Sequence, residues 1–296
     1  MKKILIIGET GFIGEKLSKF LKRFHHVYPS DENNSLSKNI SRLDINNVKK
    51  IKEFIEDKEI DEVIHLASNL IPASTEEEFI EEKNNLLEAS KELILFLSLK
   101  KIRLIFFSSG GQIYENSQER HHEAEILSPQ SFYGQSKIFI ENEILKANDL
   151  NNFPYLILRP SNIYGTRPKE KDAQGIISIF IHSITNNSDL VIFGDGAKIR
   201  DYIYINDVLD AVLKIITNES ICGVFNLTSG EEYSILEILS ICEKACNKKA
   251  MISFVPERDC DPHKTIFDNS KLMKSINIDI TPLEIGIAEM HQEISG

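Results

Sequence analysis

Apolar residues in the first half of the chain recur with two alternating spacings. Short continuous runs, such as Ile4–Ile7 and Leu104–Phe107, have the length of buried strands. Between such runs apolar residues recur every three to four positions, as at Ile13, Leu17 and Leu21, which predicts helices. Further strands are expected at 27–28, 63–66 and 155–158, and further helices near 48–55, 79–98 and from about 133. This alternation predicts an α/β fold with a Rossmann-type, doubly wound parallel sheet.

The pattern changes from about residue 161. Helical spacings at 176–185, 207–217 and 234–246 are separated by short strand-like runs at 190–193 and 224–227. We therefore expect a dinucleotide-binding Rossmann domain over 1–160. A smaller mixed α/β C-terminal substrate domain is expected over 161–296, with some of its segments returning to the Rossmann sheet.

Composition and charge narrow the classes of function. The 296 residues carry a formal charge of −11, which argues against nucleic acid as a partner because a backbone-binding surface needs clustered cations. The longest apolar run, Leu93–Leu97, is far shorter than the ~20 residues of a membrane span, and the start lacks the longer apolar stretch of a secretory signal. The four cysteines (222, 242, 246, 260) lack paired metal-type spacing, so we expect no metal and a reduced, cytoplasmic protein.

A glycine-rich loop follows the first predicted strand directly. It reads Gly8-Glu9-Thr10-Gly11-Phe12-Ile13-Gly14. In such a loop the first glycine permits a tight turn, the second lets the backbone approach a pyrophosphate, and the third lets the helix pack on the sheet. We therefore predict a dinucleotide site that includes Gly8, Gly11, Phe12, Ile13 and Gly14.

The end of the second strand bears on the choice of cofactor. Asp31 is the candidate carboxylate for a free ribose 2′-hydroxyl, and no arginine or lysine stands between Tyr28 and Leu36 to pair with a 2′-phosphate. NAD is therefore favoured over NADP. Asp31 is equally well explained as an ordinary surface-loop residue, and the same alternative applies to Asp44 and Ile45 as contacts of the adenine.

Tyr133 and Lys137 are four residues apart in a predicted helix and so share one of its faces. A tyrosine that acts as a base near pH 7 needs its pKa lowered by about three units, or roughly 4 kcal/mol. An ammonium group and the positive nicotinamide ring of an oxidised cofactor are suited to provide this together. The alternative is a chance Tyr-x3-Lys on a solvated helix.

With these motifs the chain resembles the extended short-chain dehydrogenase/reductase family, in its NAD-dependent nucleotide-sugar epimerase/dehydratase branch, and is UDP-glucose 4-epimerase-like. The resemblance runs nearly end to end. Besides the glycine loop and Tyr133–Lys137, it is carried by 65–68 (HLAS), 108–114 (SSGGQIY), 158–165 (LRPSNIYG), 194–196 (GDG) and 200–208 (RDYIYINDV).

The resemblance implies roles for further residues. Asn162 would bond a nucleotide diphosphate and Arg200 and Arg258 would clamp its phosphates, although without the family both arginines are more often surface residues. Residues implied near the cofactor are Leu66, Ala67, Ser108, Tyr133, Lys137 and Pro160. It also implies a nucleotide-diphosphate sugar as substrate, polysaccharide biosynthesis as the context, and a homodimer joined through 84–98 and 133–147.

One position departs from the family pattern. The family's catalytic serine or threonine falls on Gly110, and Gln112 replaces another frequent hydroxyl. The neighbouring Ser109 is one candidate catalytic replacement, and the amide of Gln112, as a substrate contact, is another. The dehydratase branch would place an Asp-Glu pair in this loop, where the chain has Gly110 and Gly111, so dehydration is disfavoured.

Three functions remain open from the sequence. The first is an NAD-dependent nucleotide-sugar epimerase, acting at C4 through a 4-keto intermediate. The second is a nucleotide 4-keto-sugar reductase or dehydrogenase with the same parts. The third, supported only by Gly110 and Gln112, is an NAD-binding protein without activity.

Overall fold

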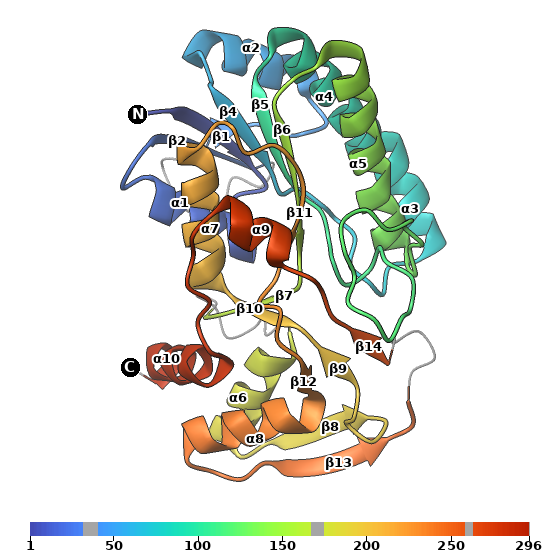
Figure 1. Cartoon of the computed structure of the whole chain (residues 1–296), viewed down its shortest axis with the longest axis vertical. Helices are drawn as coiled ribbons and strands as arrows, with labels where there is room; N and C mark the ends of the chain where they lie inside the picture. The colour runs from blue at the N-terminus through green and yellow to red at the C-terminus, as the bar shows by residue number, and fades with distance from the viewer. Residues whose placement is uncertain (32–40, 167–174, 258–262, 296) are drawn as a thin grey trace. The chain divides into compact units, whose positions relative to one another are not determined.

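The computed structural model describes residues 1–31, 41–166, 175–257 and 263–295 (Figure 1). The chain forms two compact units, neither continuous in sequence. The first contains Met1–Glu115, Ile126–Arg159 and Leu213–Phe225; the second contains Asn116–Glu125, Pro160–Val212 and Asn226–Gly296.

The first unit is built on a seven-stranded sheet in the order β11-β6-β5-β4-β1-β2-β3. Its strands are β1 (Lys3–Ile7), β2 (His26–Asp31), β3 (Ser41–Arg42), β4 (Glu62–His65), β5 (Arg103–Phe107), β6 (Tyr155–Pro160) and β11 (Gly223–Leu227). The pairs from β3 through β6 are parallel. The order reverses at β1, so the carboxyl ends of β1 and β4 flank the switch point at which such sheets bind ligands.

Helices cover both faces of this sheet, because the central strands are apolar on both sides. Side chains of α2, α4 and α5 pack into one core with Leu5, Val63, Phe106 and Ile157, whereas α1 contacts β1 and β2 (Figure 1). The helices are α1 (Phe12–Leu21), α2 (Val48–Lys58), α3 (Glu76–Glu82), η1 (Lys83–Leu87), α4 (Glu88–Lys100) and α5 (Phe132–Asn151). The predicted Rossmann-type α/β fold is confirmed.

The predicted helix over 79–98 is interrupted. α3 ends at Glu82, η1 is a π-helical turn, and α4 continues from Glu88. Such turns insert a residue into the helical repeat and are frequent at functional sites. Sequence periodicity did not reveal this one, because apolar residues on both sides of it still face the core.

The second unit has small sheets and five helices or parts of helices. Its strands are β7 (Asn162–Tyr164), β8 (Asp189–Phe193), β9 (Ile199–Arg200), β10 (Tyr202–Tyr204), β12 (Tyr233–Ser234), β13 (Met251–Val255) and β14 (Lys264–Thr265). Its helices are α6 (Ile176–Asn186), α7 (Ile205–Thr217, which crosses into the first unit), α8 (Ile235–Cys246), α9 (Ser270–Ser275) and α10 (Leu283–Ser295). Cys242 and Cys246 on α8 are free and buried, and so pack as small apolar residues.

No helix in the described part of the chain is both long and apolar enough to cross a membrane.

Candidate functional site

The turn between β1 and α1 has the geometry of a phosphate cradle. Gly8 has φ of +87°, and a Cβ at this position would lie 2.7 Å from the backbone nitrogen of Ala67. A Cβ on Gly14 would collide with the Gly8 carbonyl oxygen. Both positions therefore require glycine, and the close approach of Gly8 to Ala67 joins the turn to the end of β4.

The start of α1 fits an anionic ligand. Gly11 is its N-cap and has no side chain to accept a bond from the first-turn amides. A helix start of this kind presents N–H groups and partial positive charge to a phosphate. Among the described residues, only the Gly8 carbonyl oxygen would lie within 4 Å of a Cβ at Gly11, at 3.6 Å, so these residues leave the outer side of Gly11 open. The observed backbone thus fits a dinucleotide pyrophosphate.

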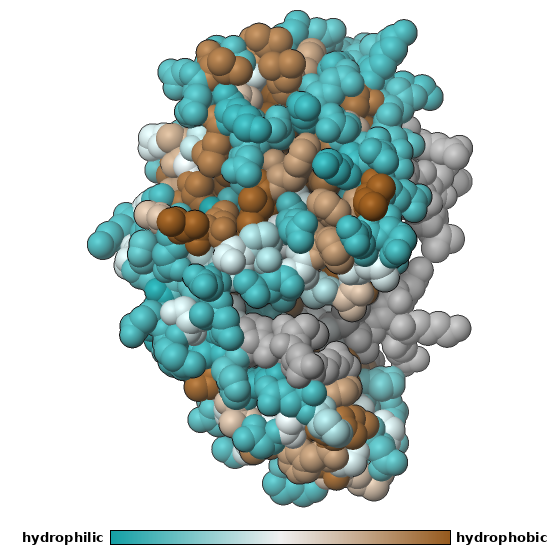
Figure 2. Space-filling view, turned by 90° about the vertical axis from the view of Figure 1, so that its right-hand side faces the viewer, coloured by the Kyte–Doolittle hydropathy of each residue, from teal (hydrophilic) through white to brown (hydrophobic). Residues whose placement is uncertain are grey.

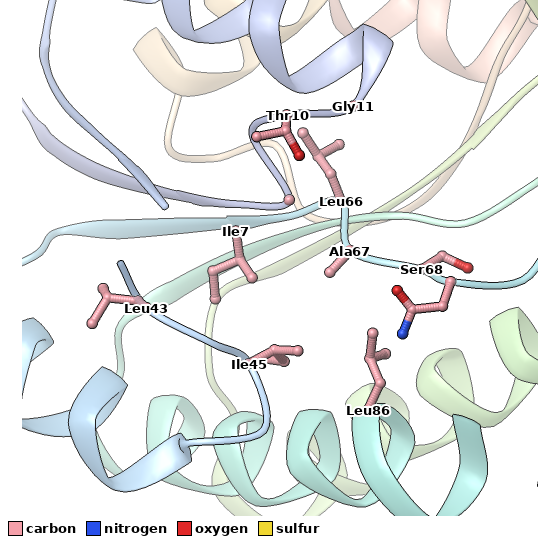
Figure 3. Close-up of a pocket in the computed structure, with 11 residues that line it drawn as sticks. Ile7, Thr10, Gly11, Leu43, Ile45, Leu66, Ala67, Ser68 and Leu86 are labelled. Atoms are coloured by element: carbon pink, nitrogen blue, oxygen red, sulfur yellow. The ribbon is translucent and has the colours of Figure 1, made fainter. Parts of the chain in front are cut away.

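A cavity of about 240 Å³ lies beside this turn (Figure 3). Thr10 and Gly11 bound one side, Ile45 and Leu86 lie opposite, and the stretch from Leu66 to Ser68 runs between them. The predicted residues that line it are Gly8, Gly11, Ile45, Leu66 and Ala67. The structure therefore brings together residues from the first, third and fourth strand ends, as a dinucleotide site requires.

The other predicted cofactor residues are not among the described residues that line this cavity. Asp44 does not line the cavity; its Oδ1 accepts the Asn46 amide at 2.8 Å and so shapes the turn before α2. Asp31 ends β2, but its side chain lies outside the described part of the structure. Phe12 and Ile13 open α1, Ser108 follows β5 and Pro160 ends β6. The Ser108 hydroxyl is buried without a hydrogen-bond partner among the described residues.

Tyr133 and Lys137 lie on the first turns of α5, which Ser131 caps by accepting the Gly134 amide at 3.1 Å. The Lys137 Nζ lies 5.3 Å from the centroid of the Tyr133 ring and donates to the Phe107 carbonyl at 3.2 Å. The predicted pairing on one helix face is therefore observed.

The protein groups around Tyr133 raise the pKa of its phenol. Burial raises the pKa of Tyr133 to about 12, and a hydrogen bond with the Ser109 side chain only partly opposes this rise. The physical reason is that desolvation penalises the phenolate, while the ammonium faces the ring and the Phe107 carbonyl. The lowering of this pKa by Lys137 and an oxidised nicotinamide together stays a prediction.

Burial also lowers the pKa of Lys137 to about 8, against the opposing charges of Glu82 and Glu141. His65 lies in the same buried region, where burial and the Lys137 charge lower its pKa to about 3. His65 is therefore neutral near pH 7, and its Nε2 bonds the Ser90 hydroxyl at 2.8 Å.

The loop with the missing hydroxyl packs against the start of α5. A Cβ on Gly134 would collide with the Gln112 carbonyl oxygen, so only glycine permits this approach. The Ser131 hydroxyl donates to Gln112 Oε1 at 2.9 Å. Ser109, rather than the glycine that replaces the family hydroxyl, is the side chain bonded to Tyr133.

In the second unit, Asn162 and Arg200 lie on neighbouring segments. The Asn162 Nδ2 donates to the carbonyl of Asp201 at 2.8 Å, and the Arg200 guanidinium donates to the carbonyls of Ile199 and His263. The buried Asp201 carboxylate accepts the amides of Ser229 and Gly230, which fixes this region. Arg258 lies outside the described residues.

Sequence reasoning missed several side chains that line the cavity. Thr10 stands inside the glycine motif, and Ser68 in the quoted 65–68 stretch, so both positions were available from the sequence. Leu43 and Leu86 had no such signal, because only the tertiary fold brings the turn before α2 and the π-helical turn to the strand ends, whereas Asn69 directly follows the quoted 65–68 stretch. Within the described residues no three histidine, cysteine, aspartate or glutamate side chains are grouped to hold a metal ion.

Comparisons with known proteins agree with this geometry. The family model "NAD dependent epimerase/dehydratase family" matches residues 4–228. The chain is 30% identical, over 92% of its length and 91% of the relative, to a dTDP-4-dehydro-6-deoxyglucose reductase from Escherichia coli.

Two solved structures are similar over nearly their whole length. A UDP-N-acetylglucosamine 4-epimerase from Methanobrevibacter ruminantium has a TM-score of 0.90 and 26% identity, with 99% of this chain and 98% of that one covered. A UDP-glucuronic acid 4-epimerase from Bacillus cereus, solved with UDP-glucuronic acid and NAD, has a TM-score of 0.86 and 26% identity, with 99% of each covered.

Proposed function

Because this chain belongs to the NAD dependent epimerase/dehydratase family, we propose that it interconverts nucleotide-diphosphate sugars at C4 through a 4-keto intermediate. Family membership makes it an NAD-dependent enzyme that acts on nucleotide sugars, as the sequence predicted. The finer reaction is supported by one observation: Tyr133 is held by the Ser109 hydroxyl, one helical turn from Lys137, in the unit that carries the glycine cradle.

In this proposal the cradle of Gly8, Gly11 and Gly14 holds the cofactor pyrophosphate. When bound, NAD supplies a reversible acceptor for the hydrogen that leaves C4 and, in its oxidised form, a positive charge that favours a nearby phenolate. Tyr133 removes the proton of the 4-hydroxyl and later returns it. The Ser109 hydroxyl donates a hydrogen bond to the phenol oxygen of Tyr133. The Lys137 ammonium stabilises the phenolate form of Tyr133.

Further contacts of both ligands are part of the proposal. Asp31 would bond the adenosine ribose, and Asn162, Arg200 and Arg258 would bind the nucleotide diphosphate of the substrate. Guanidinium groups suit these oxygens because they form paired, charge-assisted bonds. The Gln112 amide would bond the sugar, since its Oε1 is already held by Ser131.

The test is incubation of the purified protein with UDP-glucose, UDP-galactose and their N-acetyl forms, followed by chromatographic separation of the products. We expect interconversion of at least one pair without net consumption of cofactor, and its loss in Tyr133→Phe. Absence of any interconversion in this panel would contradict an epimerase with these substrates.

The second candidate is reduction of a nucleotide 4-keto sugar, which the 30% identity to the E. coli reductase favours. Here Tyr133 would donate its proton to the 4-keto oxygen. Adding dTDP-4-dehydro-6-deoxyglucose with NADH would then cause a stoichiometric loss of absorbance at the NADH band. No loss of absorbance, together with epimerisation in the first assay, would remove this candidate.

We also propose a homodimer joined through α4 and α5. Leu95 and Leu99, one turn apart on α4, are 49% and 63% exposed, and Figure 2 shows apolar patches on the side of the molecule that carries α3 to α5. Light scattering should give twice the chain mass, and Leu95→Lys should halve it; a monomeric wild type would contradict the proposal. A cytoplasmic location, expected from the cysteines, and a part in polysaccharide biosynthesis, implied by the family resemblance, remain predictions.

A further inference from the structure

Glu82 is a buried acid in an otherwise exposed acidic helix. The other acids of α3 (Glu76, Glu77, Glu78 and Glu81) face solvent, whereas Glu82 is 4% exposed. A buried carboxylate is unfavourable unless its oxygens are bonded. Its position therefore requires a compensating arrangement, and the proposed reaction does not use it.

Both carboxylate oxygens of Glu82 bind one residue. Oε1 accepts the Asn69 backbone amide at 3.0 Å, and Oε2 accepts the Asn69 side-chain amide at 2.9 Å. Asn69 lines the cofactor cavity together with Gly8 and Ala67. Glu82 therefore fixes one wall of that cavity from behind.

The π-helical turn places this carboxylate. η1 begins at Lys83, directly after Glu82, and its residue Leu86 lines the same cavity. A π-turn shifts the facing of the residues around it and is seldom kept without a role. Two side chains at this turn therefore contribute to one cavity: Leu86 lines it, and Glu82 binds Asn69 in its wall.

We propose that Glu82 is a positioning residue of the cofactor site, whose carboxylate fixes the Asn69 wall of the cavity. The proposal rests on the proposed function only in taking this cavity as the NAD site.

The proposal can be tested without an activity assay. Cofactor affinity is followed by NADH fluorescence, which is unobscured because the chain has no tryptophan. The variants are Glu82→Gln, Asn69→Ala and, as the matched control, Glu81→Gln, which removes the same charge from the neighbouring exposed position.

Glu82→Gln replaces one acceptor oxygen with an NH₂ group that cannot accept from Asn69, so it should weaken NADH binding several-fold. Glu81→Gln should leave NADH binding unchanged. Asn69→Ala should weaken NADH binding to a similar extent, and the double variant Glu82→Gln/Asn69→Ala should lose little more, because Glu82 acts through Asn69. Unchanged NADH affinity in Glu82→Gln, or an equal loss in Glu81→Gln, would overturn the proposal. Unchanged NADH affinity in Asn69→Ala would overturn it as well, including when Glu82→Gln does not fold.

Discussion

Two buried charges on neighbouring turns of α5 differ in how far their surroundings compensate them. Glu141 and Lys137 are four residues apart and almost equally buried. Glu141 receives a two-fold bond from the Arg159 guanidinium, at 3.1 and 2.6 Å, and the same guanidinium donates to the Tyr114 hydroxyl at 2.9 Å. Within the part of the chain that the structure describes, Lys137 instead donates to a single carbonyl, that of Phe107, and lies over the rings of Phe106 and Tyr133.

The pKa shifts record the difference. Burial opposes the charge of Arg159, but the bonds and charge of Glu141 outweigh it and raise the pKa of Arg159. At Lys137 burial prevails and lowers the pKa to about 8. In a saturated ion pair each buried charge compensates the other, whereas an incompletely compensated ammonium retains the capacity to interact with a ligand and with Tyr133.

The largest effect expected in this comparison is on activity. Tyr133→Phe removes the proposed proton acceptor and should lower kcat by about 10²–10⁴-fold. The thermal midpoint should change little, because the ring and its packing remain. Steady-state kinetics and a thermal melt check both; retained turnover would place the acid–base group elsewhere.

The next effect should be on stability. Glu141→Gln leaves the buried Arg159 charge without its countercharge and should reduce the free energy of unfolding by about 3–5 kcal/mol. The double variant Glu141→Leu/Arg159→Met removes both charges and should regain most of that loss. Urea unfolding of the three proteins measures this, and equal losses in the single and double variants would show that packing, not charge, is responsible.

A smaller effect should follow from pH. The folded-state pKa of Lys137, about 8, lies below the unfolded value near 10.5, so the unfolded chain binds more protons between these values. The free energy of unfolding should therefore rise with pH from about 8 to about 10.5 through this group. Urea midpoints across this range should rise more steeply in the wild type than in Lys137→Met. Parallel curves would mean that Lys137 titrates normally.

The smallest effect on stability should come from Tyr114, whose hydroxyl accepts a bond from Arg159 beside the Glu141–Arg159 ion pair. Tyr114→Phe removes one bond to the Arg159 guanidinium and should reduce the free energy of unfolding by about 1.5 kcal/mol. Since Tyr114 is given no part in the proposed chemistry, kcat should stay close to that of the wild type. A loss of kcat as large as that of Tyr133→Phe would mean that the Glu141–Arg159 pair takes part in the reaction as Tyr133 does.

The sequence by itself determined the sheet, the glycine cradle and the Tyr133–Lys137 pair. These follow from local rules: strand and helix periodicities, the glycines that a tight turn requires, and the i, i+4 spacing on one helix face. Gly8 illustrates this, because its positive φ and its approach to Ala67 exclude a side chain.

Only the tertiary structure decided what surrounds these residues. The pKa of Tyr133 is raised rather than lowered because desolvation depends on every segment packed around the phenol. The Glu82–Asn69 contact and the bond from Ser109 to Tyr133 likewise join separate segments of the chain, and the π-helical turn contributes Leu86 to a cavity lined by other segments. Burial and electrostatic compensation are sums over spatial neighbours, and a local pattern of residues does not contain them.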